Sequence, residues 1–167
     1  SCIWQMNCMK TNTWKQYADA EILKQVTVRP IRPDEKAIWD NLMSEHHYLK
    51  NARLVGRQLR QVAELDGQWV ALIGWNVAAY HLKGRESWIG WDTEQLLKRR
   101  KFVVQNSRFL LLTDRGRYPN LASRVLALSC NRLSSDWEKA NGYPVLAVES
   151  FVDPERFSGA CYRAAGW

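Results

Sequence analysis

The residues with the clearest chemical potential lie in the last third of the chain, directly after two short apolar runs. The run 109–112 leads into a polar turn that contains Arg117 and Asn120, and the run 145–148 leads into Glu149. A helix that starts at Asn120 would offer backbone amides to a phosphate, and a partly buried glutamate can act as a base. Because ligands in open α/β sheets bind at the carboxyl ends of neighbouring strands, we expect these side chains to border one site.

These residues need a strand, helix, strand, helix unit to hold them in place. The side chain of Asn120 can cap the first helix, and apolar residues recur every three to five positions from there to Gly142. A second helix is predicted from Pro154, with Asp153 as its cap. Such a crossover unit predicts two neighbouring strands that run parallel.

The first half of the chain predicts an antiparallel start to the same sheet. Apolar and polar residues alternate over 26–31 and 58–65, whereas 69–75 is almost wholly apolar and should be central. Asp66 and Gly67 between the last two runs are a strong hairpin signal. The predicted fold class is therefore α/β, in the α+β sense, with a mixed central sheet that joins an antiparallel N-terminal hairpin to the C-terminal unit.

Three further helices are predicted outside that unit. Acidic residues in the first turn favour a helix that starts at 33–35 and closes at 46–48. The stretch 13–24 is compatible with a helix, and Asp92 can cap a short helix over 92–97. The remainder of the segment around that short helix is predicted to be a polar connection.

Composition indicates one globular and basic domain. With 167 residues, 46% of them hydrophobic, the chain suffices for one core, which we expect to span 26–167 after a loosely structured lead-in, 1–25. Lysine and arginine outnumber acidic residues by 24 to 17, so the net charge is +7. Such a balance fits a polyanionic partner, DNA or RNA, or an anionic cofactor, and it also fits a plain basic surface.

The densest positive run, 98–101, follows the short helix and has Trp88, Trp91 and Phe102 nearby. Cations interleaved with aromatic rings can bind a nucleic-acid strand. The same cations can instead complement the dipole of the helix that they end. With the dispersed arginines included, the candidate nucleic-acid-binding residues are Arg57, Arg60, Lys98, Arg99, Arg100, Lys101 and Arg108.

The spacing of histidines and cysteines indicates neither a metal site nor a disulfide framework. His46 and His47 are adjacent, so they do not face each other on a helix, and His81 has no partner at ligand spacing. The four cysteines share no close paired spacing. No segment is apolar enough to span a membrane and no signal peptide is evident, so a reducing cytoplasm is the expected location.

Seven short stretches in the same order make residues 28–167 similar to the Druantia anti-phage protein DruA family, a domain also met in proteins described beside or as transposases. The seven stretches are 29–33, 46–49, 54–60, 88–91, 106–110, 119–126 and 149–157. The resemblance implies a role in anti-phage defence or transposition. It implies little about the reaction.

The order of elements also resembles the fold of GCN5-related N-acetyltransferases. In that superfamily a strand leads into a loop of the form Gln/Arg-x-x-Gly-x-Gly/Ala, whose amides hold the pyrophosphate of acetyl-coenzyme A. Here Arg117 and Ala122 match, Asn120 stands where glycine is expected, and Pro119 lacks an amide donor. Asparagine tolerates the left-handed conformation that glycine adopts. The resemblance implies acetyl-coenzyme A as a cofactor, bound by Arg117, Asn120, Leu121, Ala122 and Ser123.

Tyr162, followed by Gly166 and Trp167, matches the closing signature of the superfamily. The resemblance implies that Tyr162 returns a proton to the leaving thiolate, while a helix aromatic packed on the sheet is the alternative. Glu149, at a strand end, is the candidate base. The fold would normally continue after Trp167, so we expect the domain to lack its last strand or strands and to self-associate through an open sheet edge.

Three functions follow from these patterns. The first is a nucleic-acid-directed accessory domain of an anti-phage defence or transposon-related protein, built on an acetyltransferase-like fold. The alternative is an active acetyl-coenzyme A-dependent N-acetyltransferase with Glu149 and Tyr162 as catalytic residues. A third, a metal-dependent nuclease or transposase, would need metal-holding carboxylates. Its candidates are scattered without metal-ligand spacing, and they are Glu64, Asp66, Asp114, Glu149 and Asp153.

Overall fold

The computed structural model describes residues 13–80, 82–153, 155 and 158–167, with side chains from Asp19 onward. The strands are β1 (Thr27–Pro30), β2 (Gln58–Leu65), β3 (Gln68–Val77), β4 (Val103–Leu111) and β5 (Ala147–Ser150). The helices are α1 (Thr13–Lys24), α2 (Lys36–His46), α3 (Lys83–Ile89), α4 (Thr93–Arg99), α5 (Leu121–Asn141) and α6 (Ala160–Ala164), with 3-10 turns at Pro33–Glu35 and Arg100–Phe102.

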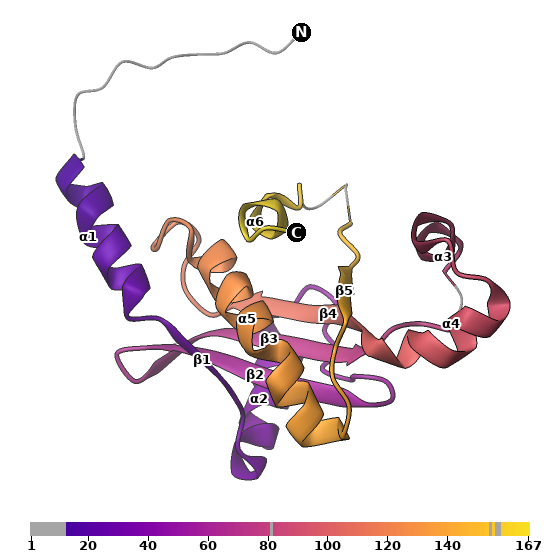
Figure 1. The fold of residues 1–167 in the computed structure, drawn as a ribbon. Coiled ribbons are helices and arrows are strands. Elements are labelled where there is room, and N and C mark those ends of the chain that lie inside the picture. The colour runs from indigo at the N-terminus through magenta and orange to yellow at the C-terminus, as the bar shows by residue number, and fades with distance from the viewer. Residues whose placement is uncertain (1–12, 81, 154, 156–157) are drawn as a thin grey trace, which may run out of the picture.

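In the described part of the chain, the five strands form one sheet in the order β1-β2-β3-β4-β5. Strands β1 to β4 are antiparallel to their neighbours, and β5 returns parallel to β4 after α5. Figure 1 shows that α5, which connects β4 to β5 in the chain, runs across one face of the sheet. The mixed sheet with its antiparallel hairpin and C-terminal crossover confirms the predicted fold class.

Each face of the sheet carries its own apolar core. On one face α5 packs Leu121, Val125 and Trp137 against β3 residues that include Ile73 and Trp75. On the other face α2 packs Trp39 and Met43 against Val62, Leu72 and their neighbours, which form a second cluster. Strand β3 contributes to both clusters, because successive side chains of a strand point to opposite faces, and it is central as predicted.

A buried polar network ties the sheet to α5. Gln61, which is fully buried on β2, donates through Nε2 to Asp136 on α5 at 2.9 Å. Its Oε1 accepts from Trp75 Nε1 at 3.0 Å, and Ser129 on α5 donates to the same oxygen. Because these buried polar atoms satisfy one another, the network fixes the position of α5 over β2 and β3 without leaving an orphan charge.

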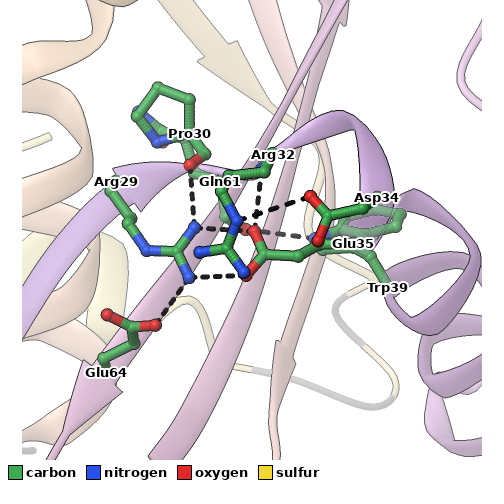
Figure 2. Close-up of polar contacts among 8 residues, drawn as sticks. All are labelled: Arg29, Pro30, Arg32, Asp34, Glu35, Trp39, Gln61 and Glu64. Atoms are coloured by element: carbon green, nitrogen blue, oxygen red, sulfur yellow. Dashed lines mark hydrogen bonds and ion pairs between the residues drawn. The ribbon is translucent and has the colours of Figure 1, made fainter. Parts of the chain in front are cut away.

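A second charged network joins β1, the turn before α2, and β2 (Figure 2). The guanidinium of Arg29 donates to both oxygens of Glu35, at 2.7 and 2.8 Å, and to Glu64 at 2.7 Å. Arg32 also binds Glu35, through a hydrogen bond from its backbone amide and an ion pair from its guanidinium. Glu35 is only 5% exposed. The hydrogen bond from Arg29 is the main cause that lowers the pKa of Glu35 to about 2, and the pKa of Arg29 is raised in turn. We call these residues, with Asp34, the Arg29–Glu35 network.

Several predicted boundaries were wrong, and each has a local reason. Strand β4 begins at Val103 and not at residue 109, because the polar residues 105–108 interrupt its apolar pattern. Strand β5 starts at Ala147, where its pairing with Val103 begins. The segment predicted as a polar connection contains the short helix α3, which has no apolar stripe. Gly90 caps its C-terminus with a left-handed φ of 73°.

The two predicted helix caps of the C-terminal unit also differ from expectation. Asn120 precedes α5 and its side chain makes no capping hydrogen bond. Its backbone is left-handed, with a φ of 65°, and not extended as in an ordinary N-cap residue. Asp153 accepts from the backbone amide of Glu155 in a turn, and α6 begins only at Ala160. Asp92 caps α4 as predicted. Predictions for residues 1–12, His81 and Pro154 lie outside the described residues.

No helix among the described residues combines the length and apolarity that a membrane crossing requires.

Candidate functional site

The site is organised by a bulge in β4. Gly74 of β3 pairs with Arg108, whereas the next residue, Trp75, pairs with Asn106, so Ser107 is the extra residue. A side chain at Gly74 would place its Cβ only 2.9 Å from the Cβ of Arg108, so glycine permits the close approach of the two strands. Two hollows adjoin this bulge, and Ser107 lines both.

The first hollow, which we call the β4–β5 cavity, has a volume of about 130 Å³. Its lining comes from β4 at and after its last residue paired with β5, from the segment that follows β5, from α6, and from the residues just after α2. Four aromatic rings line it, from Tyr48, Phe109, Phe151 and Tyr162. Its polar lining includes His47, Asn106, Ser107 and Asp153.

Tyr162, the predicted proton donor, is held at this cavity by the bulge. Its hydroxyl donates to Asn106 Oδ1 at 2.8 Å, and Asn106 Nδ2 donates in turn to the carbonyl of Gly74 at 3.2 Å. Burial raises the pKa of Tyr162 above its ordinary value, so the phenol is protonated at neutral pH. The ring also packs against Trp167, with the ring centroids 4.9 Å apart.

His47, for which the sequence indicated no metal site, is a cavity residue. It is 4% exposed, and its Nδ1 accepts from the backbone amide of Leu49 at 3.2 Å. Burial first, and the charge of Arg108 second, lower the pKa of His47 to about 4. The imidazole is therefore neutral at pH 7, and because Nδ1 accepts a hydrogen bond, the ring proton is on Nε2.

Glu149, the predicted base, is not brought to Tyr162. Glu149 lies opposite Gln105 in the parallel pairing of β4 and β5, and Ser150 lies opposite Asn106. Because successive side chains alternate between faces, Glu149 points away from the face on which Asn106 holds Tyr162. There it pairs with the buried Arg85 of α3 at 2.9 Å. Burial raises the pKa of Glu149, and the charge of Arg85 opposes that rise.

The predicted cofactor loop precedes α5. The left-handed backbone of Asn120 stands where the acetyltransferase motif has glycine. The amide of Leu121 is bonded to the carbonyl of Tyr118, whereas no described residue accepts a hydrogen bond from the amides of Ala122 or Ser123. The loop therefore presents two backbone donors at a helix start, the arrangement that attracts phosphate. The guanidinium of Arg117 lies over the ring of Tyr118, 5.3 Å from its centroid.

The second hollow, which we call the arginine groove, has a volume of about 470 Å³ and is lined by Arg53, Arg100, Arg108 and Tyr80 among others. Within the described lining there is no carboxylate. Arg108 donates to the carbonyls of Asn51 and Arg53, at 2.6 and 3.2 Å. Arg100 donates to the carbonyl of Ala78 at 2.8 Å and lies 4.9 Å from the centroid of Tyr80. The guanidinium groups are thus held in place without losing their charge.

The other predicted nucleic-acid-binding residues divide into two groups. Arg57 and Lys101 approach the ring of Tyr143, at 5.5 and 5.8 Å from its centroid, and this ring packs against the apolar cluster of α5 and is not part of the groove lining. Arg99 is exposed on α4. The charges of Lys98 and Arg60 are instead matched by carboxylates, through ion pairs with Glu94 and Asp40. Of the predicted set, Arg100 and Arg108 line the groove.

Arg53 and Tyr80 of the groove, His47 of the cavity and Arg85 beside Glu149 were missed by sequence reasoning. One usable signal was present, because no acidic residue occurs between Glu45 and Glu64. The carboxylates considered for a metal-dependent nuclease do not come together, and no cluster of three or more potential metal ligands exists in the described part of the chain.

The fold belongs to the acetyltransferase class. Aminoglycoside acetyltransferase AAC(6')-Ib in complex with coenzyme A is similar over 84% of this chain and 83% of that chain, with a TM-score of 0.55 and 15% identity. Its complex with coenzyme A and kanamycin gives the same TM-score and the same shares at 16% identity. A third structure, with ribostamycin and coenzyme A, agrees at 15% identity, a TM-score of 0.55, and 84% and 82% coverage. At these identities the likeness shows the fold.

The sequence itself gives a narrower assignment. Residues 4–167 match the family described as Druantia protein DruA, so the chain belongs to this family of an anti-phage system. A comparison with curated proteins finds no match.

Proposed function

We propose that this chain is the nucleic-acid-binding domain of an anti-phage defence protein in the cytoplasm, and that it binds the phosphate backbone of a DNA or RNA strand in the arginine groove. One observation carries the proposal. Three arginines line a single groove, carbonyls hold two of them, and no carboxylate of the described lining cancels their charge.

The chemistry of the groove favours phosphate esters. A guanidinium binds two phosphate oxygens at once, and fixing it beforehand reduces the conformational entropy lost on binding. The net charge of +7 adds long-range attraction to a polyanion. Tyr80 stands beside Arg100 in the groove lining and is 47% exposed. Because exposed rings bind unpaired bases by stacking, the groove suits a single strand.

The test is the affinity of a fluorescently labelled single-stranded oligonucleotide, measured by anisotropy. The double variant Arg53→Gln/Arg100→Gln should bind about tenfold or more weakly, because two charge-assisted phosphate contacts are lost. Lys24→Gln/Lys36→Gln removes the same charge at exposed sites that are already paired with Glu21 and Asp40. This control should bind almost like the wild type. Equal losses in both variants would refute a specific role for the groove.

We infer a second binding capacity from the loop before α5, which fits a coenzyme A phosphate in part. Asn120 has the left-handed backbone, and the amides of Ala122 and Ser123 are available among the described residues. These groups would hold the pyrophosphate of acetyl-coenzyme A, whose bound thioester would supply an acyl group. Glu149 is paired with Arg85, and this ion pair does not favour Glu149 as the catalytic base. Binding of the cofactor by this loop is therefore better supported than acyl transfer.

Calorimetric titration with acetyl-coenzyme A tests this capacity. Micromolar binding is expected in the wild type, and Asn120→Glu should abolish it by placing a negative charge beside the phosphates. Asn120→Gly is the matched control, since glycine adopts the same backbone without a side chain and should bind at least as well as asparagine. Absence of heat with the wild type would rule out the cofactor and leave the nucleic-acid proposal untouched.

We also propose self-association through β5, whose outer edge has no partner strand in the described sheet. Leu146 and Phe151 beside this strand are exposed, at 75% and 52%. An unpaired strand edge flanked by apolar side chains favours pairing with a second strand. Light scattering should give a dimer at high concentration, and a monomer throughout the range would refute this proposal.

A further inference from the structure

The β4–β5 cavity and the arginine groove are neighbours on β4. Ser107 lines both, Asn106 before it lines the cavity, and Arg108 after it lines the groove. A strand whose phosphates occupy the groove would therefore pass the entrance of the cavity. This inference rests on the proposed nucleic-acid-binding function.

The cavity has the dimensions and the lining of a site for one planar ring. Its volume of about 130 Å³ is well below the roughly 300–1,000 Å³ of pockets that enclose whole drug-sized ligands. Four of its lining residues are aromatic, and two of these, Tyr48 and Phe151, are exposed at 42% and 52%. Exposed rings beside a small cavity can stack on a flat heterocycle as it enters.

We propose that the β4–β5 cavity accepts one unstacked base of the nucleic-acid strand whose backbone lies in the arginine groove.

Polar groups inside the cavity match the edge of a neutral base. His47 is uncharged at neutral pH, carries its proton on Nε2 and presents that nitrogen without a hydrogen-bond partner among the described residues. The Tyr162 oxygen donates its proton to Asn106 and keeps lone pairs with which it can accept. The cavity thus offers His47 Nε2 as a donor and the Tyr162 oxygen as an acceptor. Because the imidazole of His47 is uncharged, this pair suits a neutral base better than a phosphate.

Cys161 provides a test in the unmodified protein, because this residue lines the cavity whereas Cys130 does not. Alkylation by iodoacetamide can be followed at each cysteine by mass spectrometry. An oligothymidine should slow the alkylation of Cys161 severalfold and leave Cys130 unchanged. An oligomer of equal length and charge that carries only abasic sites should bind the groove and leave both rates unchanged.

Variants at the entrance give a second, independent test. Tyr48→Ala/Phe151→Ala should weaken oligothymidine binding by about fivefold or more, the loss expected when base stacking is removed. The affinity for the abasic oligomer should not change. Ile38→Ala, which removes an apolar side chain that is 55% exposed on α2 outside both hollows, should change neither affinity.

The outcomes separate this inference from the proposed function. If oligothymidine and the abasic oligomer slow Cys161 equally, or if the entrance variant weakens both equally, base insertion is refuted while backbone binding stands. If neither oligomer binds the wild type, both proposals fail. Protection of Cys161 by acetyl-coenzyme A alone would assign the cavity to a thioester and would also refute base insertion.

Discussion

Two arginine clusters of this protein use the same side chain in opposite ways. In the Arg29–Glu35 network the guanidinium groups of Arg29 and Arg32 bind carboxylates at 2.7 to 3.4 Å (Figure 2). In the arginine groove Arg100 and Arg108 bind backbone carbonyls instead. The first cluster joins β1, the turn before α2 and β2, whereas the second borders an open hollow.

The difference lies in where the positive charge is compensated. A carboxylate neutralises the guanidinium, so the network gains local stability and offers little to a ligand. A carbonyl accepts the same N–H groups, fixes the same geometry and leaves the formal charge uncancelled. An arginine held by carbonyls, with no nearby acid among the described residues, is therefore a better candidate for anion binding than an arginine in a salt bridge.

The largest effect is expected from Glu35→Gln in the network. The variant should lose about 2–3 kcal/mol of unfolding free energy in urea titrations, because two arginines lose a charged acceptor while Arg29 keeps Glu64. Oligonucleotide affinity should stay within twofold of the wild type. Glu94→Gln, in the exposed pair with Lys98, is the matched control and should leave stability almost unchanged. A loss of binding in Glu35→Gln without a loss of stability would reverse the roles of the two clusters.

The same network predicts an acid-dependent loss of stability. The pKa of Glu35 is lowered in the folded state, from 4.5 to about 2, so its contribution is fully present above pH 4.5. It should be lost as pH falls from 4.5 toward 2, because the unfolded state binds the proton first. Urea midpoints measured across this range should fall more for the wild type than for Glu35→Gln. Parallel curves for the two proteins would contradict the assignment.

Arg108→Lys sharpens the comparison on the groove side. The forked guanidinium of Arg108 donates to three carbonyls, those of Asn51, Arg53 and Ser107. Lysine keeps the charge but cannot bind all three carbonyls at once. Oligonucleotide affinity should fall about fivefold because the cation is no longer held in place. Anisotropy titrations at fixed salt provide the measurement. Wild-type affinity in this variant would mean that charge alone, without fixed geometry, suffices.

The smallest effect is expected from Lys98→Gln. Lys98 already pairs with Glu94 on the exposed side of α4, so its charge is matched before any ligand arrives. The affinity should change less than about twofold. A loss as large as that of Arg53→Gln/Arg100→Gln would show that the positive run itself, and not the groove, carries binding.

Much of the fold could be predicted because its signals are local. The Asp66 and Gly67 turn, the apolar β3 and the long α5 all depend on residues close in sequence, and each was confirmed. The left-handed tolerance of Asn120 was also visible in its residue type. The start of β4 escaped prediction because the polar residues 105–108 separate Val103 and Val104 from the apolar run 109–112, and these polar side chains line the cavity and the groove.

The candidate site depends on contacts that no sequence window contains. Arg108 is held by Asn51, 57 positions away, and Arg85 meets Glu149 across 64 positions. The register of β5 on β4 decides that Glu149 and Tyr162 face apart, and a shift of one residue would reverse this relation. The helix α3 is similarly positioned by the buried Arg85 and not by an apolar stripe.

The most direct test of the central claim is the salt dependence of single-strand binding. For the wild type the logarithm of the association constant should fall steeply and linearly with the logarithm of salt concentration, because phosphate contacts release counterions. Arg53→Gln/Arg100→Gln should reduce the magnitude of that slope by about 1.4, the value for two lost contacts to a single strand. Arg32→Gln, in the Arg29–Glu35 network, should leave it unchanged. A flat wild-type slope, or equal reductions in the two variants, would contradict the account.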